Sequence, residues 1–114
     1  MADCLFCKII HGEIPSNKVY EDDKVYAFRD INPQAPVHVL VIPKEHITSV
    51  GAAEEADEAT LAACLKACAK VAKLENVAET GFRVVSNCGD DACQSVHHLH
   101  FHVLGGKKMA ENMA

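Results

Sequence analysis

The stretch from Gln94 to Gly106 constrains this chain most, because histidine alternates there with apolar residues. His98, His100 and His102 are separated by single apolar side chains, a period of two that predicts a β-strand with the imidazoles on one face. Same-face neighbours on a strand lie about 6.5 to 7 Å apart, which suits three imidazoles around one small anionic group. An expression tag or a metal-scavenging patch is the alternative, but a tag is contiguous and terminal, whereas this run is interleaved with core residues.

The remaining hydrophobic pattern predicts an α+β fold, a five-stranded antiparallel sheet with one short N-terminal helix and one long crossover helix. The short helix is expected over residues 3–11 with Asp3 as its N-cap, and the long helix over Glu54–Leu74. The expected strands are residues 18–21, 24–29, 37–42 and 82–86, and the alternating segment from His98 to Val103, here called the histidine run. At 114 residues the chain has room for one domain, residues 1–114, with a modest core.

Composition argues against several classes of function. A net charge of −5 disfavours general affinity for nucleic acid, which needs clustered Lys and Arg. The N-terminus lacks a basic region followed by an apolar run, and no run of about twenty apolar residues occurs, so we expect a cytoplasmic protein without a membrane segment. In that compartment the six cysteines are expected to be reduced thiols rather than a disulfide framework.

Several blocks of sequence, together with the histidine run, resemble the histidine triad family. In chain order these blocks are Phe6-x-Lys8-Ile9-Ile10, Glu13-Ile14-Pro15, Glu21-Asp22-Asp23, Ala27-Phe28-x-Asp30-Ile31-x-Pro33-Gln34-Ala35-Pro36 and His38-x-Leu40-Val41-Ile42-Pro43-Lys44. The Gly105-Gly106 pair and the Gln94-Ser95 lead resemble the nucleoside phosphoramidase branch more than the diadenosine polyphosphate hydrolase branch. The resemblance implies the histidine triad fold and a homodimer in which two sheets join into one of ten strands.

The resemblance also implies a reaction, hydrolysis of purine nucleoside 5′-phosphoramidates through a covalent nucleotidyl-histidine. His100 would be the nucleophile, which agrees with the ability of imidazole to act as nucleophile and proton carrier near neutral pH. His102 would hydrogen-bond the phosphate oxygens, and His38, alone in an apolar strand, would join this histidine network. Ser95 would reach the leaving group with its hydroxyl. Taken alone, a histidine such as His38 is more often a satisfied core residue.

Nucleotide-binding residues are carried over from the family in the same way. Asp30 matches the carboxylate that accepts the two ribose hydroxyls, and Asn87, Ser95 and His102 would bind the phosphate. The apolar pocket for the base would draw on Phe6, Ile9, Phe28, Ile31 and Leu40. Each of these apolar residues is about as well explained as ordinary core. No organic cofactor is expected.

A second constellation begins with Cys4-x-x-Cys7. With His46 and His98 it makes four ligands of the kind that tetrahedral zinc takes, and some members of the family bind a structural zinc with this pattern. Such a closed site would join the N-terminal helix to the histidine run without a direct catalytic role. The alternative is a pair of reduced thiols on an amphipathic helix.

Two other functions stay open at this point. One is hydrolysis of dinucleoside polyphosphates, and the other is a non-catalytic nucleotide-binding module used for regulation. His97 stands where the phosphoramidase branch usually has an aromatic residue, and the tail at residues 107–114 lacks the aromatic that helps some relatives reach the partner subunit. The physiological amine and the choice between adenine and guanine are therefore left open.

Overall fold

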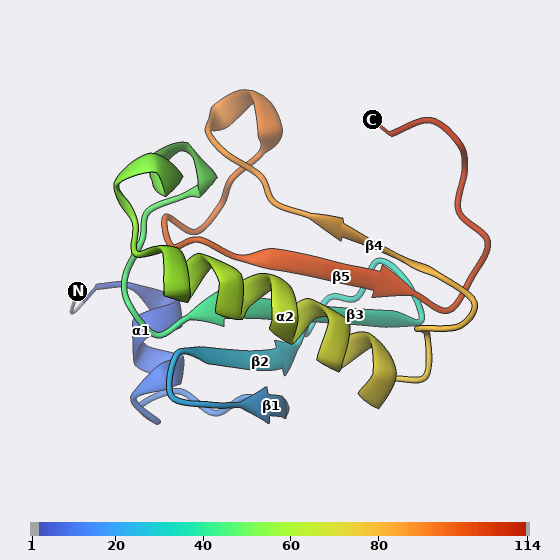
Figure 1. The fold of residues 1–114 in the computed structure, drawn as a ribbon, viewed down its shortest axis with the longest axis horizontal. Helices are drawn as coiled ribbons and strands as arrows, with labels where there is room; N and C mark the ends of the chain where they lie inside the picture. The colour runs from blue at the N-terminus through green and yellow to red at the C-terminus, as the bar shows by residue number, and fades with distance from the viewer. Residues whose placement is uncertain (1–2, 114) are drawn as a thin grey trace.

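The computed structural model describes residues 3–113 and has the predicted α+β architecture over them. An antiparallel sheet of five strands has the spatial order β1-β2-β3-β5-β4 (Figure 1). The strands are β1 (Lys18–Glu21), β2 (Val25–Arg29), β3 (Val37–Pro43), β4 (Phe82–Val85) and β5 (Phe101–Gly105). The long helix α2 (Glu58–Leu74) connects β3 to β4 and runs across the sheet, as Figure 1 shows. The short helix α1 (Leu5–Ile10) precedes β1.

The two helices cover opposite faces of the sheet. On β2 and β3 the side chains alternate between two hydrophobic cores, as a strand covered on both faces requires. The α2 face buries Val25, Ala27, Val39, Val41, Cys64, Ala67, Cys68, Val71 and Val103. The α1 face buries Phe6, Ile9, Tyr26, Phe28, Leu40 and Ile42. Two of the six free cysteines, Cys64 and Cys68, therefore pack as small apolar residues under α2, and burial raises the pKa of Cys64 to about 12.

The predicted N-terminal helix was one residue off at its cap. α1 begins at Leu5, and its N-cap is Cys4 rather than Asp3. The Cys4 Sγ accepts a hydrogen bond from the Cys7 backbone N–H at 3.4 Å. The thiol thus satisfies one of the free N–H groups at the helix start, which is the role expected of the Asp3 carboxylate.

The start of the long helix was also predicted wrongly. Residues assigned to its first turns form a separate 3-10 helix, η1 (Val50–Glu55), and α2 begins at Glu58. Asp57 has an extended backbone and caps α2, because its carboxylate accepts hydrogen bonds from the Thr60 N–H and hydroxyl, both at 3.0 Å. The acidic residues before Asp57 therefore do not load the first turn of α2.

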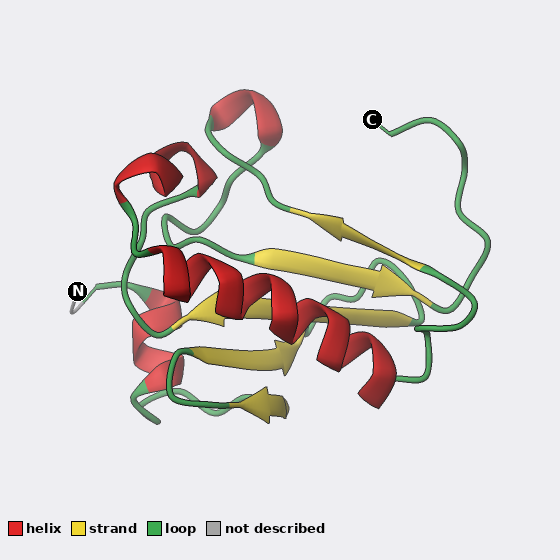
Figure 2. Ribbon diagram, viewed as in Figure 1, coloured by secondary structure: helices red, strands yellow, loops and turns green. Residues whose placement is uncertain are grey.

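The histidine run is not a continuous strand. β5 begins at Phe101, so His102 lies in the sheet while His98 and His100 lie in the irregular segment before it, drawn as loop in Figure 2. The Leu99 N–H donates to the Ile47 carbonyl at 2.6 Å instead of to a neighbouring strand. The rings of His98 and His100 still share a face, since both make edge-on contacts with Phe6.

Sheet register brings distant histidines together on the α1 face. β3 pairs with β5 so that Leu40 lies opposite His102 and His38 opposite Leu104. His38 is two residues from Leu40 on the same strand, so its side chain lies diagonal to that of His102. Among the helices of residues 3–113, none has both the length and the apolar character needed to cross a bilayer.

Candidate functional site

A cavity of about 360 Å³ lies between α1, the loop after β2 and the histidine run. Most of the residues predicted for catalysis and nucleotide binding line it: His100, His102, Ser95, Asp30, Phe6, Ile9, Phe28, Ile31 and Leu40. His38 is buried behind this wall and contacts His102. Asn87 is half-buried and is not among the lining residues, so its predicted role as a phosphate ligand gains no support from its position.

His100 is held in one orientation by its own segment. Its Nδ1–H donates to the His98 carbonyl at 2.7 Å, and its ring packs edge-on against Phe6 with the centroids 5.1 Å apart. A carbonyl oxygen only accepts, so Nδ1 carries the proton and Nε2 is left with its lone pair. The side chain is buried, yet it lines the cavity. A neutral imidazole held in this tautomer can act as a nucleophile through Nε2.

His102 is oriented by a hydrogen-bonded chain that begins in the loop after β2. The Gln34 backbone N–H donates to His38 Nδ1 at 3.1 Å, which leaves the His38 proton on Nε2. His38 Nε2 lies 2.9 Å from His102 Nδ1, so Nε2–H donates and His102 Nδ1 accepts. The proton of a neutral His102 is therefore on Nε2. His102 can present this N–H to an anionic group in the cavity.

Burial keeps these two histidines neutral at physiological pH. Desolvation, with smaller effects from His100 and His38, lowers the pKa of His102 to about 4. Desolvation also lowers the pKa of His38, an effect that the Asp30 carboxylate opposes. Both rings therefore keep one unprotonated nitrogen, as the hydrogen-bonded chain requires.

Asp30 lies at the junction of the cavity and this chain. Its Oδ1 accepts a hydrogen bond from the Asn32 N–H at 2.8 Å, and its Oδ2 lies 3.5 Å from His38 Nε2. Its backbone N–H donates to the His38 carbonyl at 3.0 Å, which fixes the start of the loop against β3. The side chain is 21% exposed, so the carboxylate can still accept hydrogen bonds from a bound ligand.

Ser95 is positioned by the residue before it. The Gln94 side chain accepts from the Gly89 N–H and donates to the Thr48 and Val96 carbonyls, at 2.9 to 3.1 Å. These three bonds close the loop after β4 and hold the Ser95 backbone at the cavity. Gln94 was predicted only as part of a family signature.

Some lining residues were not predicted from the sequence, namely Leu5, Ile14, Pro15, Ser16, Arg29, Asn32 and Val96. Ile14 and Pro15 were assigned to a turn, and only their place after an apolar helix hinted that they could face the same side. Val96 precedes the histidine run and had no distinguishing pattern. The Gln34 backbone N–H left no signal in the sequence, since every residue except proline carries one.

The four predicted metal ligands converge beside the cavity. The ligand atoms of Cys4, Cys7, His46 and His98 all lie within 4.8 Å of one another. His98 Nδ1 lies 3.4 Å from Cys4 Sγ and 3.6 Å from Cys7 Sγ, and His46 Nδ1 lies 3.4 Å from Cys7 Sγ. A tetrahedral zinc with ordinary bond lengths places sulfur and nitrogen ligands about 3.5 Å apart. The donor set and its spacing therefore fit a closed zinc site.

His98 also has the support that metal-binding histidines usually have. Its Nε2–H donates to the Pro43 carbonyl at 2.8 Å, which leaves the lone pair on Nδ1, directed at the cysteines. The residue is fully buried. Four soft or borderline ligands close the site, so a metal there would have no open position for a substrate.

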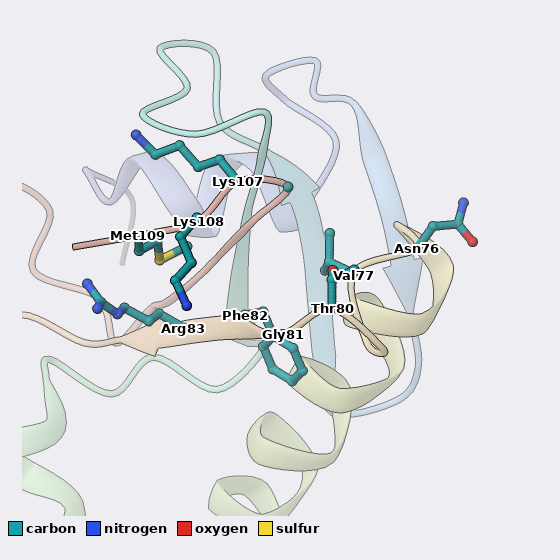
Figure 3. Close-up of a pocket in the computed structure, with 10 residues that line it drawn as sticks. Asn76, Val77, Thr80, Gly81, Phe82, Arg83, Lys107, Lys108 and Met109 are labelled. Carbon is teal, nitrogen blue, oxygen red and sulfur yellow. The ribbon is translucent and has the colours of Figure 1, made fainter. Parts of the chain in front are cut away.

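A larger cavity of about 620 Å³ lies elsewhere, between the turn after α2 and the C-terminal segment. Figure 3 shows Arg83 and Lys108 extending over β4 while Lys107 points away from it. None of the residues predicted for catalysis, nucleotide binding or metal binding lines this cavity. We therefore place the candidate site at the smaller cavity, which holds the imidazoles and Asp30.

Comparison with known proteins gives consistent results. The protein-family model described as "HIT domain" matches residues 11–109. A "14 kDa zinc-binding protein" of Zea mays is 53% identical over 107 residues, which cover 92% of this chain and 83% of that protein. "Adenylylsulfatase HINT1" of Arabidopsis thaliana is 52% identical, covering 92% and 72%. "Purine nucleoside phosphoramidase" of Escherichia coli is 43% identical, covering 98% and 94%.

Solved structures agree with this match. A histidine triad protein from Clostridium difficile has a TM-score of 0.93 and 48% identity, with 99% of this chain and 98% of that chain covered. A histidine triad nucleotide-binding protein from Candida albicans has a TM-score of 0.82 and 37% identity, with 98% and 87% covered. The similarity thus extends over nearly the whole length of the chain.

Proposed function

This chain belongs to the HIT domain family, and we propose that it hydrolyses purine nucleoside 5′-phosphoramidates. Its relatives in that family include nucleotide hydrolases and nucleotide-binding proteins. The observation that carries the proposal is the pair of opposite tautomers at the cavity wall. His100 offers a lone pair on Nε2, and His102 offers an N–H on Nε2. One ring can attack phosphorus while the other donates to a phosphoryl oxygen.

The reaction would run in two displacements. His100 Nε2 attacks the α-phosphorus, the P–N bond breaks, and the amine leaves with its electron pair and takes up a proton. The phosphorylated ring then carries a positive charge, which the His98 carbonyl stabilises at Nδ1–H. Water next attacks the same phosphorus and gives up a proton, which replaces the one taken by the amine; the bond to Nε2 breaks, and the nucleoside monophosphate leaves. Both steps are easier than a single displacement by water.

The other residues would bind and protonate. His102 donates its Nε2–H to the phosphoryl oxygens, where charge accumulates in each transition state. Ser95 lines the same cavity and would give the leaving nitrogen a proton through its hydroxyl. Asp30 would accept the two ribose hydroxyls, and the apolar wall of Phe28, Ile31 and neighbouring residues would pack on the base.

The relatives support this substrate class through their names. The Escherichia coli relative is called a purine nucleoside phosphoramidase, and the Arabidopsis relative an adenylylsulfatase. The two names refer to a phosphoramidate and to an adenylyl sulfate, both of which are derivatives of a nucleotide phosphate. Adenosine 5′-phosphosulfate is therefore the second substrate to test, since the attack by His100 would be the same.

The test is release of a fluorescent amine from an adenosine 5′-phosphoramidate. We expect turnover by the wild type, no turnover by His100→Ala, and nucleotide binding retained in that variant. Mass spectrometry of rapidly quenched wild-type protein should find a nucleotidyl group on His100. Substantial turnover by His100→Ala would defeat the assignment, and binding without turnover in the wild type would favour a regulatory nucleotide-binding module.

We further propose that Cys4, Cys7, His46 and His98 hold a structural zinc. The spacing of these four side chains and the names of the two plant relatives called zinc-binding proteins support it. Zinc there would join α1 to the histidine run and supply folding energy. Elemental analysis of purified protein should find about one zinc per chain, and less than about 0.2 would contradict a closed site of this kind.

A homodimer is proposed on the exposed apolar surface at one edge of the sheet. Phe82 and Val84 on the edge strand β4 are 36% and 40% exposed, and Leu65 on α2 is 60% exposed. An unpaired edge strand with apolar side chains is a surface that proteins usually cover. Light scattering after gel filtration should give twice the chain mass, and a monomer at micromolar concentration would refute this proposal.

A further inference from the structure

Asp30, His38 and His102 form a continuous chain of contacts inside the protein. Asp30 Oδ2 lies 3.5 Å from His38 Nε2, and the same nitrogen lies 2.9 Å from His102 Nδ1. The His38 side chain is 3% exposed, so water does not substitute for either partner. Among the contacts of the described residues, one buried nitrogen thus joins the carboxylate at the cavity to the imidazole that would bind phosphate.

The identity of the donors gives this chain a direction. The Gln34 backbone N–H can only donate, so His38 Nδ1 accepts and His38 Nε2 holds the proton. The Asp30 carboxylate can only accept when ionised, so it faces the side of His38 that carries the proton. The opposite tautomer would turn a lone pair of His38 toward the carboxylate and an N–H toward the Gln34 N–H. The Gln34 N–H and the Asp30 carboxylate therefore favour the same His38 tautomer, the one with its proton on Nε2.

We propose that Asp30 is a positioning residue for His102. Acting through His38, its carboxylate keeps the proton on His38 Nε2, and His102 then has its own proton on Nε2, where the phosphate would bind. This inference rests on the proposed function for its catalytic consequence. The ribose hydroxyls would bind the same carboxylate, so recognition of the sugar and orientation of His102 share one side chain.

One ligand atom from each of Asp30, His38 and His102 also lies within 4.8 Å of the other two, a spacing that a metal ion could use. However, the proton on His38 Nε2 lies between the atoms that would have to converge on the ion. The distance of 2.9 Å between the two nitrogens is that of a normal N–H···N hydrogen bond. We therefore interpret these three residues as a hydrogen-bonded group that fixes which ring nitrogens carry protons. A metal bound among them would contradict this interpretation.

Asp30→Asn is the informative substitution. Asparagine has nearly the same shape, but its amide can turn an N–H₂ toward His38 Nε2 and favour a lone pair there. His38 would then accept, His102 Nδ1 would hold the proton, and His102 Nε2 would face the phosphate with a lone pair instead of an N–H. Asp30→Ala removes the carboxylate without adding a donor and serves as the second variant.

The first experiment measures the ring protons in the protein without substrate. Two-bond ¹H–¹⁵N correlation spectra distinguish protonated from unprotonated ring nitrogens, and His38→Leu and His102→Gln assign the signals. We expect Nε2–H at both rings in the wild type and in Asp23→Asn, a matched loss of an exposed carboxylate on the turn after β1. We expect the tautomer with Nδ1–H to predominate at both rings in Asp30→Asn, and a mixture of tautomers in Asp30→Ala.

Three results would overturn the proposal. These are a wild-type His38 with its proton on Nδ1, rings unchanged in both Asp30 variants, and a metal found by elemental analysis in the wild type that Asp30→Ala loses although it keeps Cys4, Cys7, His46 and His98. A change of tautomer in the variants, combined with a wild type that hydrolyses no phosphoramidate, would instead refute the proposed function and leave the positioning role intact.

The second experiment measures kcat and KM in a double-mutant cycle. Asp30→Asn should lower kcat by ~10- to 100-fold, the range seen when a residue that orients a functional histidine is lost, and should also raise KM because the ribose contact is weakened. In a His38→Leu background the same substitution should change kcat by less than about threefold and still raise KM. Equal losses of kcat in the two backgrounds would show that Asp30 does not act through His38.

Discussion

His102 is expected to make the fold less stable in mild acid. Its pKa is about 4 in the folded protein against an ordinary value of 6.5, chiefly because the ring is desolvated. Below pH 6.5 the unfolded chain binds a proton at this residue that the folded chain does not bind until the pH approaches 4. The contribution of the neutral His102 to the unfolding free energy is therefore fully present above pH 6.5, declines as the pH falls, and is lost below pH 4.

The size of the effect follows from the same two values. The difference between 6.5 and about 4 corresponds to about 3 kcal/mol of unfolding free energy, of which about 2 kcal/mol is lost by pH 5. His100 and His38 oppose a charge on His102, whereas Asp30 favours one, and these contributions are included in that pKa. A loss of this size is a large share of the stability of a small domain.

Urea unfolding of the wild type and of His102→Gln, at about pH 7.5 and about pH 5, measures this contribution. Glutamine does not titrate, so the wild type should lose about 2 kcal/mol more than the variant over this interval. Both proteins keep Cys4, Cys7, His46 and His98, so acid release of a metal cancels in the difference. If the two proteins lose stability in parallel, the ring is not desolvated in the way described and the reasoning fails.

Three further predictions concern separate parts of the molecule. Gly105→Ala should cost about 1 to 3 kcal/mol in urea unfolding, because a Cβ there would lie 3.0 Å from two carbons of Val77, and the loss should shrink in a Val77→Ala background. Ser95→Ala should slow hydrolysis of an alkylamine phosphoramidate by ~100-fold, and that of a weakly basic arylamine phosphoramidate far less, because the better leaving group needs less protonation. Equal losses with the two substrates would show that Ser95 does not protonate the leaving nitrogen. Val84→Lys should shift sedimentation from dimer to monomer while leaving the circular dichroism of the chain unchanged.

The sheet was predicted well because its strands carry strong local signals. The alternation on β2 and β3 places two separate apolar sets on two faces. The start of α2 was misplaced because four acidic residues resemble a favourable first turn, whereas the Asp57 to Thr60 hydrogen bonds decide where the helix begins. The helix propensity of the residues before Asp57 therefore did not decide where α2 begins; the N-cap hydrogen bonds of Asp57 did.

The candidate site was predicted in its residue types but not in its geometry. Spacing alone placed His98, His100 and His102 on one face of one strand. The backbone joins the sheet only at Phe101, because Leu99 bonds to Ile47 and the His98 side chain contacts the cysteines. Hydrogen bonds made by backbone groups far apart in sequence carry no compositional signal, so neither the start of β5 at Phe101 nor the Gln34 contact was predictable.

His98 links the two candidate sites through three of its atoms. Nδ1 faces the cysteines, Nε2–H donates to the Pro43 carbonyl, and the carbonyl oxygen accepts the Nδ1–H of His100. The residue that would bind zinc therefore also holds the acceptor that decides which nitrogen of His100 is free to attack. The three histidines are not equivalent in this arrangement, since the first orders the backbone, the second presents a lone pair and the third presents a proton. A period of two places them close together, and the different partner of each ring gives it a different chemistry.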